Sequence, residues 1–483
     1  MADTEGRSKL SLFDVVNLVV GAIIGADIYV ASSFGAGYLG PGSILVWIIA
    51  GVIAIILALC FAQCASYVTR VGGTYAYAKE AWGTFAGFIV GWSIWLAEWM
   101  SLAVFPVAFV EYLMFFVPNL GWYEQSAVKL VFVIFLALSN IVGVKAAGRT
   151  NDVLTIIKLV PLLLFSAVAA IFVFQNPSIA AGNYMPFLPL GFSGFGSALV
   201  LIFWAYAGFE IAAIPADEIK DAGKNISRAI TIGIVIVTVF YLTTNALLFA
   251  VRPWTQLATD TTPLTSATQY ILTSVPLLAI IGATVVGIGA LVSIAGSDES
   301  GMIGTSRLGY AMAVDGLFPK SFAKVHPRFK TPYIGIIIQS ATAFVASLFG
   351  GLGMLVATAV FLLAVGYAAT CASIFPLRKK NLNPQFKLKG ESVIAVAGLI
   401  FSIYLITQCS FTQIGLGMVM LLVGVPIYIK FTPKKELTEL KKNLISNEAR
   451  FDEVIEIEHR FLAHPLYHIK MAYRRRKKGG QQQ

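Results

Sequence analysis

The sequence predicts an all-α membrane protein with 12 transmembrane helices. Of its 483 residues, 57% are hydrophobic and only 12% are charged, whereas a soluble domain carries about 25% charged residues. Apolar runs of helix length recur from end to end, and the mean hydropathy is +0.79. These observations outweigh the length of the chain, which by itself would suggest several soluble domains.

The expected spans are apolar runs of about the length that crosses a bilayer. In chain order they cover residues 14–37, 42–67, 84–117, 126–143, 152–174, 196–216, 228–251, 275–313, 333–350, 354–376, 391–409 and 411–431. The third and eighth are long, so we expect them to tilt or to extend into a loop.

Basic residues gather in alternate loops, which predicts that both termini are cytoplasmic. The net charge of +10 therefore indicates membrane orientation and not a nucleic-acid partner. The basic residues of this set are Arg7, Lys9, Arg70, Lys79, Lys145, Arg149, Lys220, Lys224, Arg228, Arg307, Lys320, Lys324, Arg328, Lys330, Arg378, Lys379, Lys380, Lys387 and Lys389. In the opposite set of loops, the one after the seventh span carries a single base, Arg252.

The two ends of the chain differ in composition from the spans. Residues 1–13 are predicted to form a cytoplasmic segment with no cleavable signal, and residues 432–483 a cytoplasmic tail. The tail combines a Lys/Glu-rich run of helical leucine spacing with the basic cluster Arg474–Lys478. We expect an amphipathic helix that binds anionic lipid, with a regulatory or partner-binding role as the alternative.

The first span contains the run Gly21–Tyr29, in which Gly25 and Asp27 contradict a simple lipid-spanning helix. A glycine costs a helix interior about 1 kcal/mol relative to alanine. A carboxylate at bilayer depth costs about 2.5–3.5 kcal/mol on insertion scales. The helix is therefore expected to break there and to line a polar cavity.

The sixth span repeats this combination in the run Phe203–Glu210, where a glycine and a carboxylate again interrupt an apolar helix. Five spans separate the two runs, so the second copy enters the membrane from the opposite side. Interrupted helices at corresponding positions of two halves are typical of a transporter's binding site.

Four runs carry a resemblance to the amino acid–polyamine–organocation (APC) superfamily. GAIIGADIY at 21–29 resembles its first-helix pattern G-x-I-I-G-S-G-I-F, and FWAYAGFE at 203–210 resembles its sixth-helix pattern. PADEIK at 215–220 with NISRAI at 225–230, and SRLGYAMAVDG at 306–316 with VHPRFKTP at 325–332, resemble its loops after helices six and eight. Together the matches extend in order from residue 14 to about residue 376.

The resemblance implies a LeuT-like fold, in which helices 1–5 and 6–10 form a 5+5 inverted repeat and two helices are added. Residues 14–376 would be the transporter core, with repeats at about 14–174 and 196–376, and residues 377–431 would be the two additional helices. It also implies secondary transport of amino acids or amines by alternating access, in a monomer or homodimer.

In the family, backbone N–H groups of the unwound first helix bind the substrate carboxylate, and carbonyls of the sixth-helix break bind the amine. The resemblance thus implies substrate-binding positions at both breaks, with a glutamate of the third span added. These positions are Ile23, Gly25, Ala26, Asp27, Glu98, Phe203, Trp204, Ala205 and Gly208. Trp204 matches an aromatic residue that stacks over the substrate in some members of the family. The alternative is that Trp204 packs against lipid. For Phe203 we expect a packing role more than contact with the substrate.

Asp27 departs from the family pattern, which has glycine at this position. An anion there would repel a substrate carboxylate and attract an amine or a metal cation. Alternatively, Asp27 points away and pairs with a base such as Lys158.

Proton coupling is expected to involve ionisable groups inside the spans. Lys158 matches a lysine that sodium-independent members carry near the family's sodium site; snorkelling to the cytoplasmic surface is the alternative. Glu210 matches an acidic residue that some members use for proton linkage. Asp298 and Glu299 depart from the family pattern, and because neighbours project about 100° apart on a helix, we expect that they do not both face one cavity.

The spans contain five acids and one base, namely Asp27, Glu98, Glu210, Asp298, Glu299 and Lys158. If all are buried, this excess of negative charge is too costly unless some acids are protonated or a cation is bound. We therefore expect a cationic substrate, namely a polyamine, a diamine or a basic amino acid. A proton-coupled permease for neutral amino acids is the main alternative.

Other classes fit less well. Paired broken helices build an occluded site and not the continuous pore of a channel, whereas a non-transporting nutrient sensor on the same fold stays open. An enzyme is not expected, because no HExxH motif is present and the four histidines lie in cytoplasmic segments.

Neither a metal nor a cofactor is predicted, and Cys60, Cys64, Cys371 and Cys409 are expected to be small core residues.

Overall fold

The computed structural model describes residues 10–70, 72–143, 148–210, 219–380, 383–384 and 387–438, except for the side chains of residues 148–157. These residues form helices joined by short loops, and no β-strand occurs among them. The prediction of an all-α chain is therefore confirmed for the part that the structure describes. The terminal segments 1–9 and 439–483, with most of the predicted lipid-binding tail, lie outside the described residues.

The first predicted span consists of two helices, α1 (Leu12–Ile23) and α2 (Ala26–Leu39). The backbone turns extended at Ile24, whose N–H still donates to the Val20 carbonyl oxygen and closes α1. Gly25 then precedes the first turn of α2 with a conformation outside the helical region. The predicted break in this span is thus confirmed.

The sixth predicted span is also interrupted. Helix α9 (Phe195–Phe203) tightens into the 3₁₀ turn η2 (Trp204–Tyr206), and the chain then becomes extended at Ala207. Gly208 follows with φ of +115°, a conformation that residues with a Cβ rarely adopt. This position therefore requires glycine, and the second predicted break is confirmed. Residues 211–216 of this span lie outside the described residues.

The other ten predicted spans each coincide with a helix whose ends lie within a few residues of the expected ones. These helices are α3 (Ser43–Tyr67), α5 (Thr84–Leu113), α6 (Trp122–Val142), α7 (Gly148–Gln175), α10 (Ala222–Val251), α13 (Pro276–Val314), α14 (Tyr333–Phe349), α15 (Leu352–Lys379), α16 (Glu391–Gln408) and α17 (Phe411–Phe431). Four short helices were not predicted, namely α4 (Thr74–Trp82), α8 (Pro177–Asn183), α11 (Trp254–Leu257) and α12 (Pro263–Ile271).

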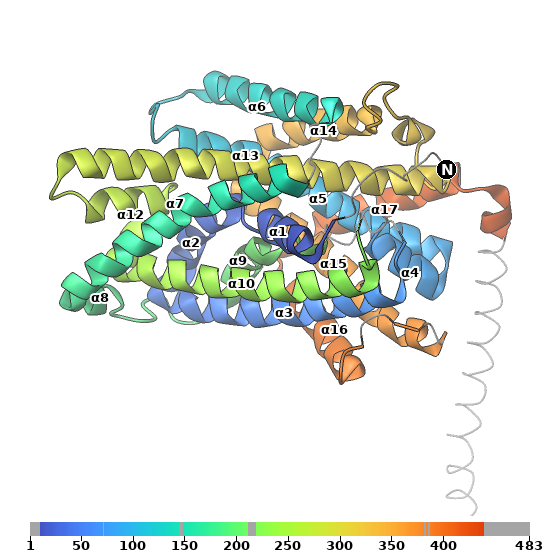
Figure 1. The fold of residues 1–483 in the computed structure, drawn as a ribbon, viewed down its shortest axis with the longest axis horizontal. Coiled ribbons are helices and arrows are strands. Elements are labelled where there is room, and N and C mark those ends of the chain that lie inside the picture. The colour runs from blue at the N-terminus through green and yellow to red at the C-terminus, as the bar shows by residue number, and fades with distance from the viewer. Residues whose placement is uncertain are drawn as a thin grey trace, which may run out of the picture. The chain divides into compact units, whose positions relative to one another are not determined.

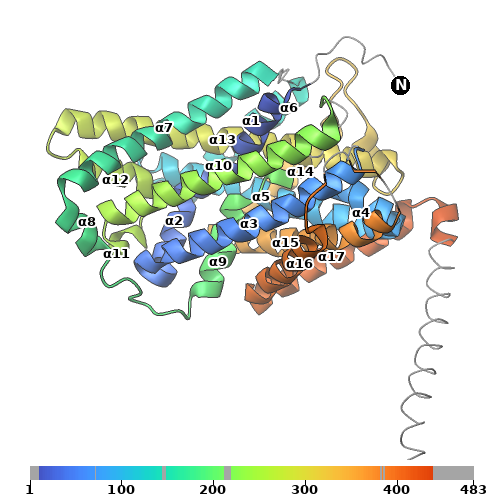
Figure 2. The ribbon, with the colours of Figure 1, turned by 60° about the horizontal axis from the view of Figure 1, so that its bottom comes forward.

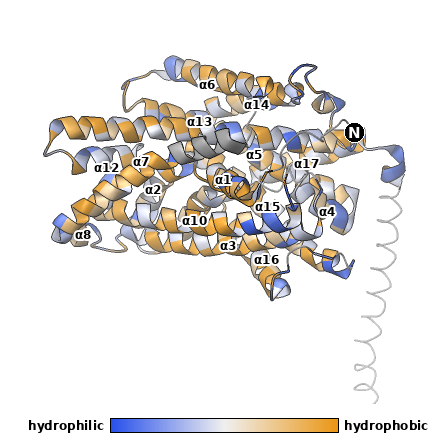
Figure 3. Cartoon of the chain, in the orientation of Figure 1, coloured by the Kyte–Doolittle hydropathy of each residue, from blue (hydrophilic) through white to orange (hydrophobic). Residues whose placement is uncertain are grey.

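Nine helical segments of the described chain are long and apolar enough to cross a membrane. One of them, Ala26–Tyr67, joins α2 to α3 through the 3₁₀ turn η1 (Gly40–Gly42). Three shorter apolar helices accompany them, at Leu12–Ile23, Phe195–Tyr206 and Tyr333–Phe349. Hydrophobic residues cover much of α6 and α13 in Figure 3. On α6, Val131 and Phe135 are 67% and 68% exposed, as expected of side chains that face lipid.

The broken helices lie inside the bundle (Figures 1 and 2). Helix α1 packs against α7, α10 and α13, while α2 packs against α9. Helix α10 lies along α3, and α5 packs against both α13 and α15. At one edge α6 and α14 pack together against α5. The two breaks are therefore surrounded by protein, where an interrupted backbone can find partners. This unit of the chain ends at Phe431.

Candidate functional site

The two breaks contact each other at the centre of the bundle. A Cβ atom added to Gly208 would lie 2.8 Å from the carbonyl oxygen of Ala22, in the last turn of α1. Gly25 is equally close to α13, since a Cβ there would lie 2.6 Å from the Ser297 Oγ atom. Gly208 thus permits a close approach of the α1 backbone, and Gly25 a close approach of the Ser297 side chain.

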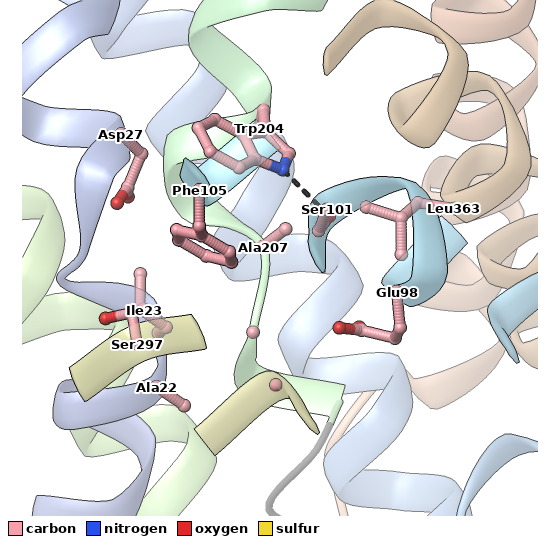
Figure 4. Close-up of a pocket in the computed structure, with 12 residues that line it drawn as sticks. Ala22, Ile23, Asp27, Glu98, Ser101, Phe105, Trp204, Ala207, Ser297 and Leu363 are labelled. Atoms are coloured by element: carbon pink, nitrogen blue, oxygen red, sulfur yellow. Dashed lines mark hydrogen bonds between the residues drawn. The ribbon is translucent and has the colours of Figure 1, made fainter. Parts of the chain in front are cut away.

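A narrow, partly open cavity of about 40 Å³ lies between the breaks (Figure 4). Its lining comes from both broken helices and from α5, α13 and α15, through Ala22, Ile23, Asp27, Glu98, Ser101, Phe105, Trp204, Ala207, Gly208, Ser297, Gly301 and Leu363. A water molecule needs about 10–15 Å³ of such volume. The cavity therefore holds a few waters at most, and a larger ligand enters only if the surrounding helices move apart.

Asp27 is held by the first break and by α10. Its Oδ1 atom accepts the backbone N–H of Gly25 at 2.8 Å, and its Oδ2 atom accepts the hydroxyl of Tyr241 at 2.7 Å. The same hydroxyl lies 3.2 Å from the carbonyl oxygen of Ile23. Asp27 is buried yet still borders the cavity. Its hydrogen bonds therefore go to the break and to a tyrosine and not to Lys158.

Lys158 of α7 reaches the other side of the first break. Its Nζ atom donates to the Gly21 carbonyl oxygen at 3.2 Å and to Ser297 Oγ at 3.3 Å, and Ser297 in turn donates to the Ile24 carbonyl oxygen at 3.0 Å. Gly296 makes room for the lysine, because a Cβ there would lie 2.5 Å from Lys158 Cε. The buried ammonium group ends inside the bundle, so the snorkelling alternative is wrong.

The second break brings two glutamates together. Glu210 accepts the backbone N–H of Gly208 at 2.9 Å through its Oε2 atom. The carboxyl groups of Glu98 and Glu210 interact with each other, and both residues are buried. Only Glu98, from α5, borders the cavity, on the side away from Asp27 (Figure 4).

Trp204 closes part of the cavity against α5. Its indole N–H donates to Ser101 Oγ at 3.2 Å, and its ring centroid lies 5.8 Å from that of Phe105. With 5% of its surface exposed, Trp204 does not pack against lipid, so that alternative is wrong. It instead borders the cavity, and an indole ring there can attract a cation.

Some predicted site residues lie outside the lining. Gly25, Ala26, Phe203 and Ala205 are packed beside the breaks, and the Phe203 ring contacts the Tyr367 ring at a centroid distance of 6.3 Å. Their part is to shape the backbone around the cavity.

Asp298 and Glu299 of α13 also stand away from the cavity. Glu299 accepts the Ser139 hydroxyl of α6 at 3.0 Å. Asp298 is fully buried, and neither of its carboxyl oxygens has a hydrogen-bond partner among the described atoms. As expected from their angular separation on a helix, the two neighbours do not face one cavity.

Sequence reasoning missed several residues of the site. Ser101, Phe105, Ser297 and Leu363 border the cavity, and Tyr241 orients Asp27. Ser297 had a usable signal, because it directly precedes Asp298 and Glu299 in the eighth span. The others are ordinary apolar or hydroxyl residues in long apolar helices, so only the packing of the helices identifies them.

The described residues hold no group of three or more His, Cys, Asp or Glu that could bind a metal ion. All four cysteines are buried and free, as expected of small core residues. Of the histidines, His326 lies in the loop after α13, and the other three lie outside the described residues.

Comparison with known proteins identifies the chain. Residues 10–429 match the family model of amino acid permeases. The branched-chain amino acid permease BcaP of Bacillus subtilis (strain 168) is 30% identical, over 89% of this chain and 94% of the relative. The serine/threonine exchanger SteT and the methylthioribose transporter of the same organism are each 26% identical over 89% of this chain, and the alignments cover 98% and 94% of their lengths. This chain therefore belongs to the amino acid permease family of the APC superfamily and is a multi-pass membrane protein, not an enzyme.

Proposed function

We propose that this protein is a secondary active transporter that moves an amino acid or an amine by alternating access. The observation that carries the proposal is the cavity at the junction of two helix breaks, which stand at corresponding positions of the two halves of the chain. Its volume of about 40 Å³ is too small for an amino acid, so the cavity must widen before a substrate can bind.

The proposed architecture has 12 membrane passes in a LeuT-like arrangement. The first pass combines α1 with α2, and the sixth contains α9 with η2. The repeats would cover about residues 14–174 and 196–376, with α16 and α17 as the two added helices. The basic loops favour cytoplasmic termini in the cell membrane.

A cationic substrate is favoured by the charges that border the cavity. Asp27 and Glu98 supply two carboxyl groups, and no Lys or Arg occurs among the lining residues that the structure describes. Trp204 and Phe105 add aromatic faces that suit an ammonium group. The relatives leave the choice open, because they include a branched-chain amino acid permease and a methylthioribose transporter. A neutral amino acid permease is the second candidate, and BcaP is the observation in its favour.

Protons are the proposed coupling ion. Lys158 puts an ammonium group beside the first break, where it can replace a bound cation and release a proton. Glu98 and Glu210 place two carboxyl groups together at the second break, a pair that a shared proton would stabilise. Asp298 and Glu299 are further candidates for proton binding because they too lie within a membrane helix.

The test is uptake into proteoliposomes with and without a pH gradient, using putrescine, cadaverine, lysine, leucine and alanine. Saturable uptake that the gradient accelerates supports a proton-coupled transporter. Binding without flux would instead identify a sensor, and currents far above carrier rates would identify a channel. Preference for leucine or alanine with no response to amines would replace the cationic substrate by a neutral one.

A further inference from the structure

The two breaks share one hydrogen-bond pattern. In each, the backbone N–H of a glycine donates to the carboxylate of the residue two positions later, from Gly25 to Asp27 at 2.8 Å and from Gly208 to Glu210 at 2.9 Å. In both breaks, a carboxyl group of the chain itself therefore accepts a hydrogen bond from a backbone N–H that the interrupted helix leaves free.

At the first break the chain's own groups occupy the free backbone atoms. The carboxylate of Asp27 faces the N–H groups of Gly25, Asp27 and Ile28, which form the positive end of α2. The carbonyl oxygens of Gly21, Ile23 and Ile24 accept hydrogen bonds from Lys158, Tyr241 and Ser297. A second carboxylate brought by a ligand would have to displace the first from these donors.

The surroundings of Asp27 make that displacement unfavourable. The Tyr241 hydroxyl fixes the Asp27 carboxylate at 2.7 Å, and the opposite wall of the cavity carries the carboxyl group of Glu98. A ligand carboxylate would thus meet acids on two sides, whereas an ammonium group between them would find charge-assisted partners.

We propose that Asp27 takes the place of a substrate carboxylate, so that the transported molecule is a primary amine without an α-carboxylate. Its ammonium group binds between Asp27 and Glu98, and its apolar body lies against Trp204 and Phe105. This inference rests on the proposed transport function and narrows its substrate class.

The experiment compares each amino acid with the amine that its decarboxylation gives. Cadaverine is matched with lysine, and 3-methylbutylamine with leucine, in binding and uptake assays on the full chain. In the wild type we expect each amine to bind about tenfold or more tightly than its parent, because the carboxylate of the amino acid would have to displace the Asp27 carboxylate from a charged hydrogen bond.

Two substitutions of Asp27 separate charge from backbone access. Asp27→Asn keeps an acceptor for Gly25 and removes the charge, so it should weaken amine binding without gain for the amino acids. Asp27→Gly also uncovers the Gly25 N–H, so the parent amino acids should now bind better than the amines. Glu124→Gln, an exposed acid in the first turn of α6, is the control and should leave the preference unchanged.

The outcomes distinguish the two proposals. Tighter binding and faster uptake of lysine or leucine than of their amines by the wild type would overturn the inference while transport stands. Binding of no member of either pair, nor of any compound in the wider panel, would overturn the proposed function itself. If the Asp27 variants fail to fold, the wild-type comparison alone still decides.

Discussion

The two helix breaks use the same backbone device but meet opposite partners. At the first break, the Asp27 carboxylate and the Lys158 ammonium group stand on either side of the unwound segment, so a charge of each sign is present. At the second break, Glu210 has Glu98 as its neighbour, so both nearby groups are acids. The first break is thus stable as it stands, whereas the second needs a proton or a cation.

This difference suggests a division of labour between the breaks. The first holds its shape through Tyr241, Ser297 and Lys158, which come from three different helices. The second has fewer fixed partners, since Glu210 accepts the Gly208 N–H and otherwise has only the Glu98 carboxyl group and the Tyr367 hydroxyl beside it in the described structure. We therefore expect the first break to be sensitive to loss of any partner and the second to be sensitive to charge.

The largest effect is expected from Lys158→Ala. It removes the only cation that contacts the first break among the described residues, and with it two hydrogen bonds from a buried ammonium group to the Gly21 carbonyl oxygen and to Ser297 Oγ, at a cost of about 3 kcal/mol in stability. Uptake in proteoliposomes should lose its response to a pH gradient. Lys129→Ala on α6, a half-buried lysine that donates to the Ser347 carbonyl oxygen, is the control and should keep the response. If the gradient still drives uptake in the Lys158 variant, the coupling role is wrong.

A smaller effect is expected from Gly208→Ala at the second break. The new Cβ would combine a φ of +115° with a distance of 2.8 Å to the Ala22 carbonyl oxygen, so about 1–3 kcal/mol of stability should be lost and substrate affinity with it. Gly191→Ala is a matched control, because φ is +67° there but no atom lies within 4 Å. Thermal unfolding in detergent measures both. Equal losses in the two variants would show that contact between the breaks adds nothing.

Much of this fold could be predicted from the sequence, because apolar runs and basic loops carry strong signals. Even the two breaks were visible, since Gly25 with Asp27 and Gly208 with Glu210 are out of place in an apolar helix. The four short helices could not be found by the same means, because α4 or α12 is neither long nor uniformly apolar.

The site was predictable only in part. Charged residues such as Asp27 and Lys158 stand out in a membrane span, whereas Tyr241 looks like any other aromatic of a long helix. Its role depends on a contact across 214 residues of sequence, which no local pattern encodes. Similarly, the direction in which Asp298 points depends on how α13 is rotated against its neighbours.

A third prediction compares the tyrosines that adjoin the two acids. Tyr241→Phe removes the hydroxyl that Asp27 accepts at 2.7 Å and should cost about 1–3 kcal/mol, seen as weaker substrate binding and a lower unfolding temperature. Tyr367→Phe removes a hydroxyl that lies beside the Glu210 carboxyl group without a hydrogen bond of standard geometry, and it should cost much less. The reverse order would mean that the second break, and not the first, is the one held by fixed hydrogen bonds.

The smallest effect is expected where the second break touches α5. Trp204→Phe keeps an aromatic ring over the cavity but loses the indole N–H that donates to Ser101 at 3.2 Å. A double-mutant cycle with Ser101→Ala should give a coupling free energy of about 1 kcal/mol in substrate binding, since one neutral hydrogen bond joins the pair. Additive losses would show that this bond does not hold the tryptophan in place. Because Trp204 follows directly from α9, such coupling would also show that closure of the cavity depends on α5 as well as on the two breaks.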